Sequence, residues 1–213
     1  MSSTQDKPLI MTVDDEPEIN TLLKEMLELQ GKFRTMSAAG GNEALELLES
    51  HADDLPSLIL LDIMMEPMDG WETLESIKGL SKYRRIPVVM LTAKPLTAET
   101  VNEKEKMALI ENYIVKPITF TEITQKTSEI LGSEMDIKNK VHALISQGKE
   151  KEAKEFERSK RAILRHRKLI DTLKKCAAAT GSEDSVKVTR VVKMQENLIR
   201  MCEIKIEKIE SSV

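Results

Sequence analysis

Polar residues of several types each follow a short apolar run that has the composition of a buried strand. They are Asp14 and Asp15 after 9–13, Asp62 after 58–61, Thr92 after 87–91, and Lys116 after 113–115. Carboxylates, a hydroxyl and an ammonium gathered in one place suit phosphoryl transfer to a carboxylate, which depends on charge neutralisation and positioning. Clustered carboxylates repel one another, and a hard cation such as Mg²⁺ relieves that repulsion.

The elements that position these residues alternate along the first part of the chain. The expected strands are 9–13, 33–38, 58–61, 87–91 and 113–115, and the expected helices are 16–30, 42–50, 69–80, 97–109 and 119–131. This alternation predicts an α/β fold, a doubly wound parallel sheet of five strands with helices on both faces. The carboxyl ends of parallel strands share one edge, where ligands bind. We therefore expect the polar residues to converge there.

Five short motifs at these strand ends resemble the receiver domain of two-component response regulators, the CheY-like family. The motifs are Asp14-Asp15, Leu60 to Met65, Met68-Asp69-Gly70, Leu91-Thr92-Ala93 and Tyr113-x-x-Lys116-Pro117. The resemblance covers about residues 7–132 and implies a flavodoxin-like fold. It also implies a phosphorylated signalling switch rather than an enzyme, with a sensor histidine kinase as partner. Mg²⁺-dependent self-phosphorylation from a donor and self-dephosphorylation are expected.

The resemblance also implies a role for each site residue. The phosphoacceptor is Asp62, and Thr92 and Lys116 bind phosphoryl oxygens. The implied Mg²⁺ ligands are Asp14, Asp15, Asp62 and the backbone carbonyl of Met64. Tyr113 is the aromatic residue that turns inward when Thr92 moves.

Some of these residues also have a plainer structural interpretation. Acidic residues are favourable near helix N-termini, which would account for Asp14 and Asp15, and Asp69 is best explained as the N-cap of its helix. Thr92 would then be a strand-end hydroxyl, and Tyr113 would be ordinary packing. The ordered set of motifs favours the phosphoacceptor interpretation for the site as a whole.

Charge and composition divide the chain near Gly132-Ser133. Residues 1–133 hold 13 Lys and Arg against 23 Asp and Glu, a net of −10, whereas residues 134–213 hold 19 against 13, a net of +6. All seven prolines lie in the first part. We therefore expect a receiver domain at 1–133 and a second domain at 134–213. The sequence contains neither a long apolar segment nor an apolar signal region, so we expect a cytoplasmic protein without membrane contact.

The second domain is predicted to be an all-α, long helical hairpin. Its first helix is expected over 135–179, with Gly148 as a point of kinking or breakage, and its second over 186–211 after a turn at 180–185. Apolar residues seven apart, such as Phe156, Ile163 and Ile170, give a coiled-coil-like stripe. The stripes are too broad for one partner helix, so the hairpin should dock on the receiver or pair with a second hairpin. We favour the homodimer, a four-helix bundle.

Two features of the hairpin leave other functions open. Six basic residues between Arg158 and Lys168 would suit a DNA-binding transcriptional regulator, although a solvated helix face is the plainer interpretation. His166 would suit a phosphorelay phosphotransferase, because helical hairpins of that class carry a phosphoacceptor histidine. Its spacing from Ile163 and Ile170 instead favours a packed polar residue that sets the helix register.

Overall fold

The computed structural model describes residues 7–93, 109–180 and 185–211. Most of the helix expected at 97–109 and of the turn expected at 180–185 lies outside the described residues. Contacts divide the chain into two compact units, Met1–Leu131 and Gly132–Val213. Among the described helices, none has the length and apolar character needed to cross a membrane.

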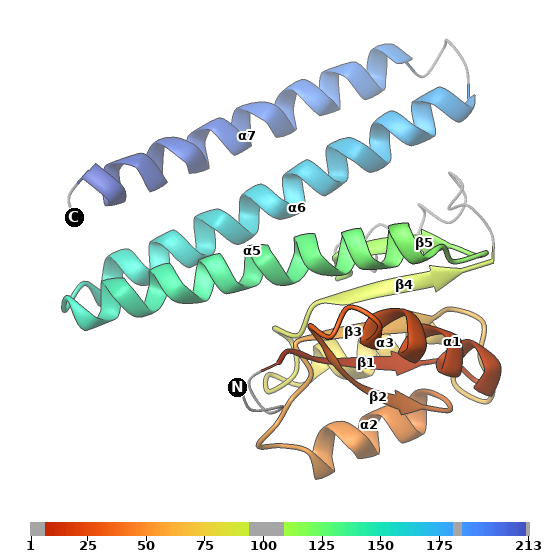
Figure 1. The fold of residues 1–213 in the computed structure, drawn as a ribbon. Helices are drawn as coiled ribbons and strands as arrows, with labels where there is room; N and C mark the ends of the chain where they lie inside the picture. Colours follow the sequence, from red (N-terminus) through yellow and green to blue (C-terminus); the bar gives the residue numbers. More distant parts are fainter. Residues whose placement is uncertain (1–6, 94–108, 181–184, 212–213) are drawn as a thin grey trace. The chain divides into compact units, whose positions relative to one another are not determined.

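The first unit is built on a parallel sheet in the order β2-β1-β3-β4-β5 (Figure 1). Its strands are β1 Leu9–Val13, β2 Arg34–Ala38, β3 Leu58–Asp62, β4 Val88–Thr92 and β5 Asn112–Val115. Every residue of β1, β3 and β4 is buried, as expected where helices cover both faces of a parallel sheet. The predicted five-stranded, doubly wound fold is confirmed.

Helices cover both faces of this sheet. They are α1 Pro17–Glu28, α2 Gly41–Ser50, α3 Gly70–Gly79 and the first part of α5 Phe120–Ser146. Alternation along β3 separates two cores, because Ile59 and Leu61 pack in the cluster that includes α2 and α3. Leu58 and Leu60 pack in the cluster that includes α1 and α5. The sheet is therefore fixed from both sides, which holds its strand ends in place.

The predicted helix at 119–131 was wrong at its C-terminal boundary. Helix α5 continues through Gly132 to Ser146, so the boundary between the two units falls inside it. A single glycine inside a helix costs only about 1 kcal/mol relative to alanine. Burial of Ile137 and Leu144 in the second unit stabilises the helix beyond that point, and tertiary packing overrides the local signal.

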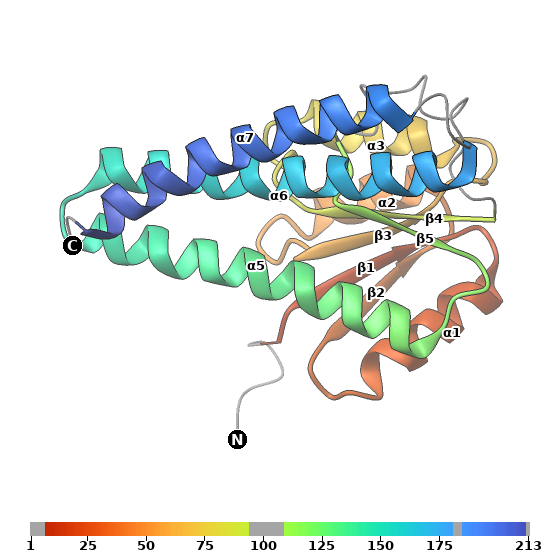
Figure 2. The ribbon, with the colours of Figure 1, turned by 90° about the horizontal axis from the view of Figure 1, so that it is seen from above.

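Over its described residues, the second unit contains three helical segments rather than two. Besides residues 132–146 of α5, it holds α6 Glu150–Thr180 and α7 Ser185–Ser211, which lie side by side (Figure 2). The helix predicted over 135–179 is broken at Gly148, whose φ of 75° is the left-handed conformation that favours glycine. The amide of Lys149 donates to the carbonyl of Leu144, which closes α5. The prediction of an all-α unit is confirmed.

Candidate functional site

The carboxyl ends of β1, β3 and β5 bring together three charged side chains. Lys116 Nζ lies 2.9 Å from Asp14 Oδ2 and 2.8 Å from Asp62 Oδ1. Asp14 is fully buried and Asp62 is 3% exposed. The lysine ammonium therefore bridges two buried carboxylates from strands β1 and β3, as parallel pairing of these strands requires.

Backbone and loop contacts hold each carboxylate in place. One oxygen of Asp62 accepts from the amide of Met64 at 2.7 Å, and Asp14 Oδ1 accepts from the amide of Glu16 at 3.0 Å. Asn20 donates through Nδ2 to the carbonyls of Asp14 and Ala38. This buried asparagine ties α1 to the ends of β1 and β2. Sequence reasoning missed it, although an Asn within the apolar stripe of a predicted helix was the available signal.

The loop after Asp62 is fixed at the start of α3. Asp69 caps this helix, since its side chain accepts from the amide of Glu72 and the Glu72 side chain accepts from the amide of Asp69. The N-cap prediction for Asp69 is confirmed. Gly70 donates its amide to the carbonyl of Ile63. A Cβ at Gly70 would meet the carbonyl oxygen of Asp62, so this close approach needs glycine.

The neighbours of Asp62 offset only part of the cost of burying its negative charge. Burial raises the pKa of Asp62, and the charge of Asp14 adds to that rise, while Lys116 and the Met64 amide offset part of it. For Lys116, burial alone would lower the pKa, but the hydrogen bonds and charges of Asp62 and Asp14 outweigh it and raise the pKa. Lys116 therefore stays cationic at neutral pH, and the pair of carboxylates still favours a further cation.

The oxygen donors of the site fit Mg²⁺ in kind, and the ligand set itself stays a prediction. Within the described ranges, no group of three or more metal-ligating side chains is assembled. Asp15 is exposed, and one of its carboxylate oxygens lies 3.4 Å from the amide nitrogen of Glu66. Asp14, Asp15, Asp62 and the Met64 carbonyl would hold the ion, which would neutralise charge on a phosphoryl group.

The two residues assigned to switching lie on neighbouring strands. Thr92 ends β4 and is buried, and its carbonyl accepts from the amide of Lys116 at 2.7 Å. Tyr113 on β5 is half-buried and packs against the core cluster that includes α2 and α3. Lys126 Nζ on α5 donates to the carbonyl of Tyr113 and lies 5.8 Å from the centre of its ring. A movement of this ring would therefore change a contact with α5.

The other candidate, His166, lies in the seam between α6 and α7. Its Nδ1 donates to Oε1 of the buried Gln195 at 2.6 Å. The surrounding cluster of the second unit is apolar and includes Ile163 and Ile170 of α6 and Ile199 of α7. A single polar pair in such a seam sets the register of the two helices, because any shift would bury His166 and Gln195 without hydrogen-bond partners. This contact favours the register interpretation of His166.

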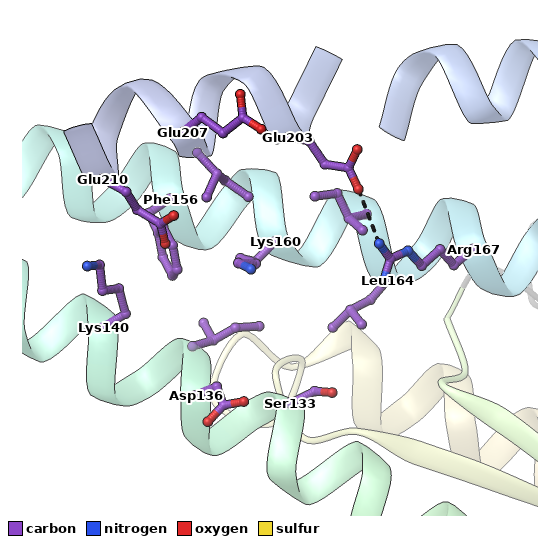
Figure 3. Close-up of a pocket in the computed structure, with 13 residues that line it drawn as sticks. Ser133, Asp136, Lys140, Phe156, Lys160, Leu164, Arg167, Glu203, Glu207 and Glu210 are labelled. Atoms are coloured by element: carbon purple, nitrogen blue, oxygen red, sulfur yellow. Dashed lines mark hydrogen bonds and ion pairs between the residues drawn. The ribbon is translucent and has the colours of Figure 1, made fainter. Parts of the chain in front are cut away.

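A groove of about 490 Å³ opens within the second unit between α5, α6 and α7 (Figure 3). Its apolar floor includes Ile137, Phe156, Ile163 and Ile206. Charged residues of both signs surround it: Asp136, Lys140, Lys160, Arg167, Glu203, Glu207 and Glu210. Arg167 and Glu203 form an ion pair at 3.1 Å. Lys160 and Arg167 of α6 therefore share this groove with acidic neighbours rather than forming a uniformly basic surface.

A buried aspartate beside a lysine, at the carboxyl edge of a five-stranded parallel sheet, is the arrangement of a receiver domain. The family described as response regulator receiver domain matches residues 10–128. The chain belongs to this family, and its receiver is a component of two-component signalling.

Curated relatives match the same part of the chain. Transcriptional regulatory protein CpxR of Escherichia coli K12 is 38% identical over 122 residues, which are 57% of this chain and 48% of CpxR. Chemotaxis protein CheY1 of Helicobacter pylori is 29% identical over 58% of this chain and 97% of its own. The chain thus spans about half the length of relatives such as CpxR, whereas CheY1 is matched almost throughout.

Solved structures agree with this assignment of the fold. The receiver domain of a signal transduction histidine kinase from Syntrophus aciditrophicus has a TM-score of 0.52 at 29% identity, over 59% of this chain and 90% of that chain. A response regulator structure from Chloroflexus aurantiacus has a TM-score of 0.53 at 23% identity, over 60% of this chain and 99% of its own. These similarities concern the receiver part of the chain.

Removing the lysine ammonium should leave Mg²⁺ binding intact. Lys116 is the cationic side chain at hydrogen-bond distance from both carboxylates in the described part of the chain. Because Lys116→Met removes that charge, Mg²⁺ should bind as tightly as before or more tightly. Calorimetric titration with MgCl₂ measures this, with the exposed Lys24→Met as the control. Asp14→Asn should weaken binding. A Lys116→Met protein that lost Mg²⁺ as Asp14→Asn does would make the lysine part of the metal site.

Proposed function

We propose that this protein is a cytoplasmic two-component response regulator, in which phosphorylation of Asp62 controls a C-terminal helical output unit. A sensor histidine kinase donates the phosphoryl group, and Mg²⁺ is bound by Asp14, Asp15, Asp62 and the Met64 carbonyl. The output unit, residues 134–213 with the α6–α7 hairpin, forms a homodimer or binds a protein partner. The receiver acts as a switch, and the chain supplies its own phosphorylation and dephosphorylation chemistry.

One observation carries this proposal: the contact of Lys116 with both Asp14 and Asp62 at 2.8–2.9 Å. In this proposal, Asp62 is the nucleophilic carboxylate. Lys116 is the cation that pairs with the phosphoryl group, and Asp14 is the acidic neighbour that binds the metal. Thr92 ends the adjacent strand, and in this proposal its hydroxyl binds another phosphoryl oxygen. Incubation with a small phosphodonor and MgCl₂, followed by intact-mass measurement, tests it. One added phosphate that requires Mg²⁺ supports the assignment, and an unmodified chain contradicts it.

In this proposal, a change in the position of the Tyr113 ring carries the signal to the output unit. The phosphoryl group draws Thr92 toward it, and the space it leaves lets Tyr113 turn inward. That movement alters the contact of Tyr113 with Lys126 on α5. Helix α5 contributes residues to both units, so it offers a direct route for the change to reach the output unit.

Small-angle scattering should detect this change in the full chain. We expect the scattering curve with a beryllofluoride phosphoryl mimic and Mg²⁺ to differ from the curve with Mg²⁺ alone. The Thr92→Val variant should show a reduced difference, because it loses the hydroxyl that binds the phosphoryl oxygen. Superimposable curves for the unmodified sequence would make the output unit a static scaffold.

A DNA-binding regulator is the alternative function, since relatives such as CpxR are named transcriptional regulators. The matched region of CpxR covers only 48% of that protein, and the basic residues of α6 have acidic neighbours such as Glu134, Glu157 and Glu203. Duplex binding measured at several salt concentrations separates the two functions, because phosphate contacts weaken steeply with salt. A phosphorelay role of His166, the weaker alternative, would appear as acid-labile phosphate that is absent from His166→Gln.

A further inference from the structure

A lysine of α5 contacts the tyrosine of β5 at two points. Lys126 Nζ donates to the carbonyl oxygen of Tyr113 at 2.6 Å, and it lies 5.8 Å from the centre of the Tyr113 ring. This separation is within the distance at which a cation is attracted to an aromatic face. One side chain therefore holds both the backbone and the ring of Tyr113.

A glutamate one turn earlier on the same helix holds the ammonium of Lys126 in place. Glu122 Oε1 lies 2.8 Å from Lys126 Nζ, and an acidic residue four positions before a lysine is the favoured order on a helix. The side chain of Lys126 is only 20% exposed, so salt screens its charge less than on an open surface. The cation is therefore oriented before the ring of Tyr113 moves.

The two contacts of Lys126 have different consequences. Strand β5 is the edge of the sheet and pairs with β4. The amide and the carbonyl of Tyr113 are bonded by side chains, those of Asn112 and Lys126. The bond to the carbonyl therefore satisfies an acceptor at the sheet edge, and it does not depend on where the ring lies. The contact with the ring does depend on it.

We propose that Lys126 is a positioning residue that holds the Tyr113 ring in its half-buried place and thereby lowers the affinity of the receiver site for a phosphoryl group. This inference rests on the proposed function, in which Thr92 moves toward the phosphoryl group and the ring turns inward. The cation–π contact is lost in that turn. A contact made in one of two conformations favours that conformation, and it weakens the binding of a ligand that needs the other.

Calorimetric titration with beryllofluoride at saturating MgCl₂ tests this inference. Lys126→Met removes the cation and should raise the affinity for beryllofluoride about two- to fivefold, the size of one partly exposed cation–π contact. Lys126→Arg keeps a cation beside the ring, so it should bind as the unmodified chain does or more weakly. The matched control is Lys138→Met, an exposed lysine of the same helix. It changes the net charge equally and should leave the affinity unchanged.

A double-mutant cycle with Tyr113→Leu separates this role from a purely structural one. Leucine keeps an apolar side chain but has no aromatic face, so Lys126→Met should raise the affinity in the unmodified background and leave it unchanged beside Tyr113→Leu. An equal rise in both backgrounds would mean that the lysine acts without the ring. No rise in the unmodified background would mean that the lysine does not restrain the ring. Either result would overturn the inference.

Lys126→Gln separates the ring contact from the bond at the sheet edge. Its amide keeps a donor for the carbonyl of Tyr113 but carries no charge, so the affinity for beryllofluoride should rise as in Lys126→Met. This second variant keeps the test decisive if Lys126→Met does not fold, which chemical denaturation checks. An affinity of Lys126→Gln equal to that of the unmodified chain would count against the ring contact.

Binding by the unmodified chain distinguishes failure of this inference from failure of the proposed function. A chain that binds beryllofluoride with Mg²⁺, and whose uncharged variants at Lys126 bind it equally well, would refute the role of Lys126 alone. An unmodified chain that binds no beryllofluoride would refute the proposed function, and the inference that rests on it would fall with it.

Discussion

Replacing the proposed phosphoacceptor, Asp62→Asn, should abolish Mg²⁺-dependent phosphorylation. The amide lacks the carboxylate nucleophile, and its neutral oxygen is a weaker ligand for Mg²⁺. Asn has nearly the same shape, so the contacts with Met64 and Lys116 should largely persist. Intact-mass measurement after incubation with a small phosphodonor should show complete loss of the added phosphate.

The control for this substitution is Asp53→Asn. Asp53 is exposed in the loop before β3 and makes no contact in the site, so phosphate uptake should equal that of the unmodified chain.

Thermal unfolding should show that Asp62→Asn is at least as stable as the unmodified protein, because burial raises the pKa of Asp62 and so disfavours its charged form in the fold. A Mg²⁺-dependent phosphate that persists in Asp62→Asn would move the phosphoacceptor elsewhere.

Substituting alanine at Gly70 should give the largest loss of stability among the glycine positions of α3. The added Cβ would overlap the carbonyl oxygen of Asp62 and the Cα of Ile63, both backbone atoms that cannot move aside as a flexible side chain would. Overpacking of this kind costs about 1–3 kcal/mol. The overlap should also displace the backbone of Asp62, so phosphorylation should slow. Chemical denaturation and the phosphorylation rate measure the two effects.

Gly79→Ala on the same helix is the matched control. A Cβ there meets nothing within 4 Å, so the gain in helix propensity should leave stability equal or slightly raised. If Gly70→Ala unfolded at the same denaturant concentration as Gly79→Ala, the loop between Asp62 and α3 would be more flexible than its contacts indicate. The Asp69 cap would then be the main restraint on that loop.

Strand boundaries and site residues of the receiver were predictable because local patterns encode them. The apolar run at 58–61 reads as a buried strand, and Asp62 after it must lie at the carboxyl edge of a parallel sheet. The same reasoning placed Asp14 and Lys116, and their contacts with Asp62 and each other agree with it. Such positions follow from the period of each strand and from the alternation of strands with helices, which implies parallel pairing, and both can be read along the chain.

Residues that depend on contacts between distant segments were less predictable. Asn20 ties α1 to the ends of two strands through the carbonyls of Asp14 and Ala38. The pattern of its own helix does not indicate those partners. The end of α5 was also misplaced, because Gly132 is a local stop signal whereas Ile137 and Leu144 are stabilised by packing in the second unit. Tertiary burial outweighs the propensity of one glycine.

The sequence by itself determined the class of fold, the acidic and basic division of the chain and the convergence of Asp14, Asp62 and Lys116. These depend on residue type and spacing. Only the tertiary structure decided that Lys116 bridges both carboxylates, that His166 pairs with Gln195, and that Lys126 donates to the carbonyl of Tyr113. Which partner a polar or apolar group finds depends on how distant segments pack, because hydrogen bonds and burial act over a few ångströms in space, whatever the distance along the chain.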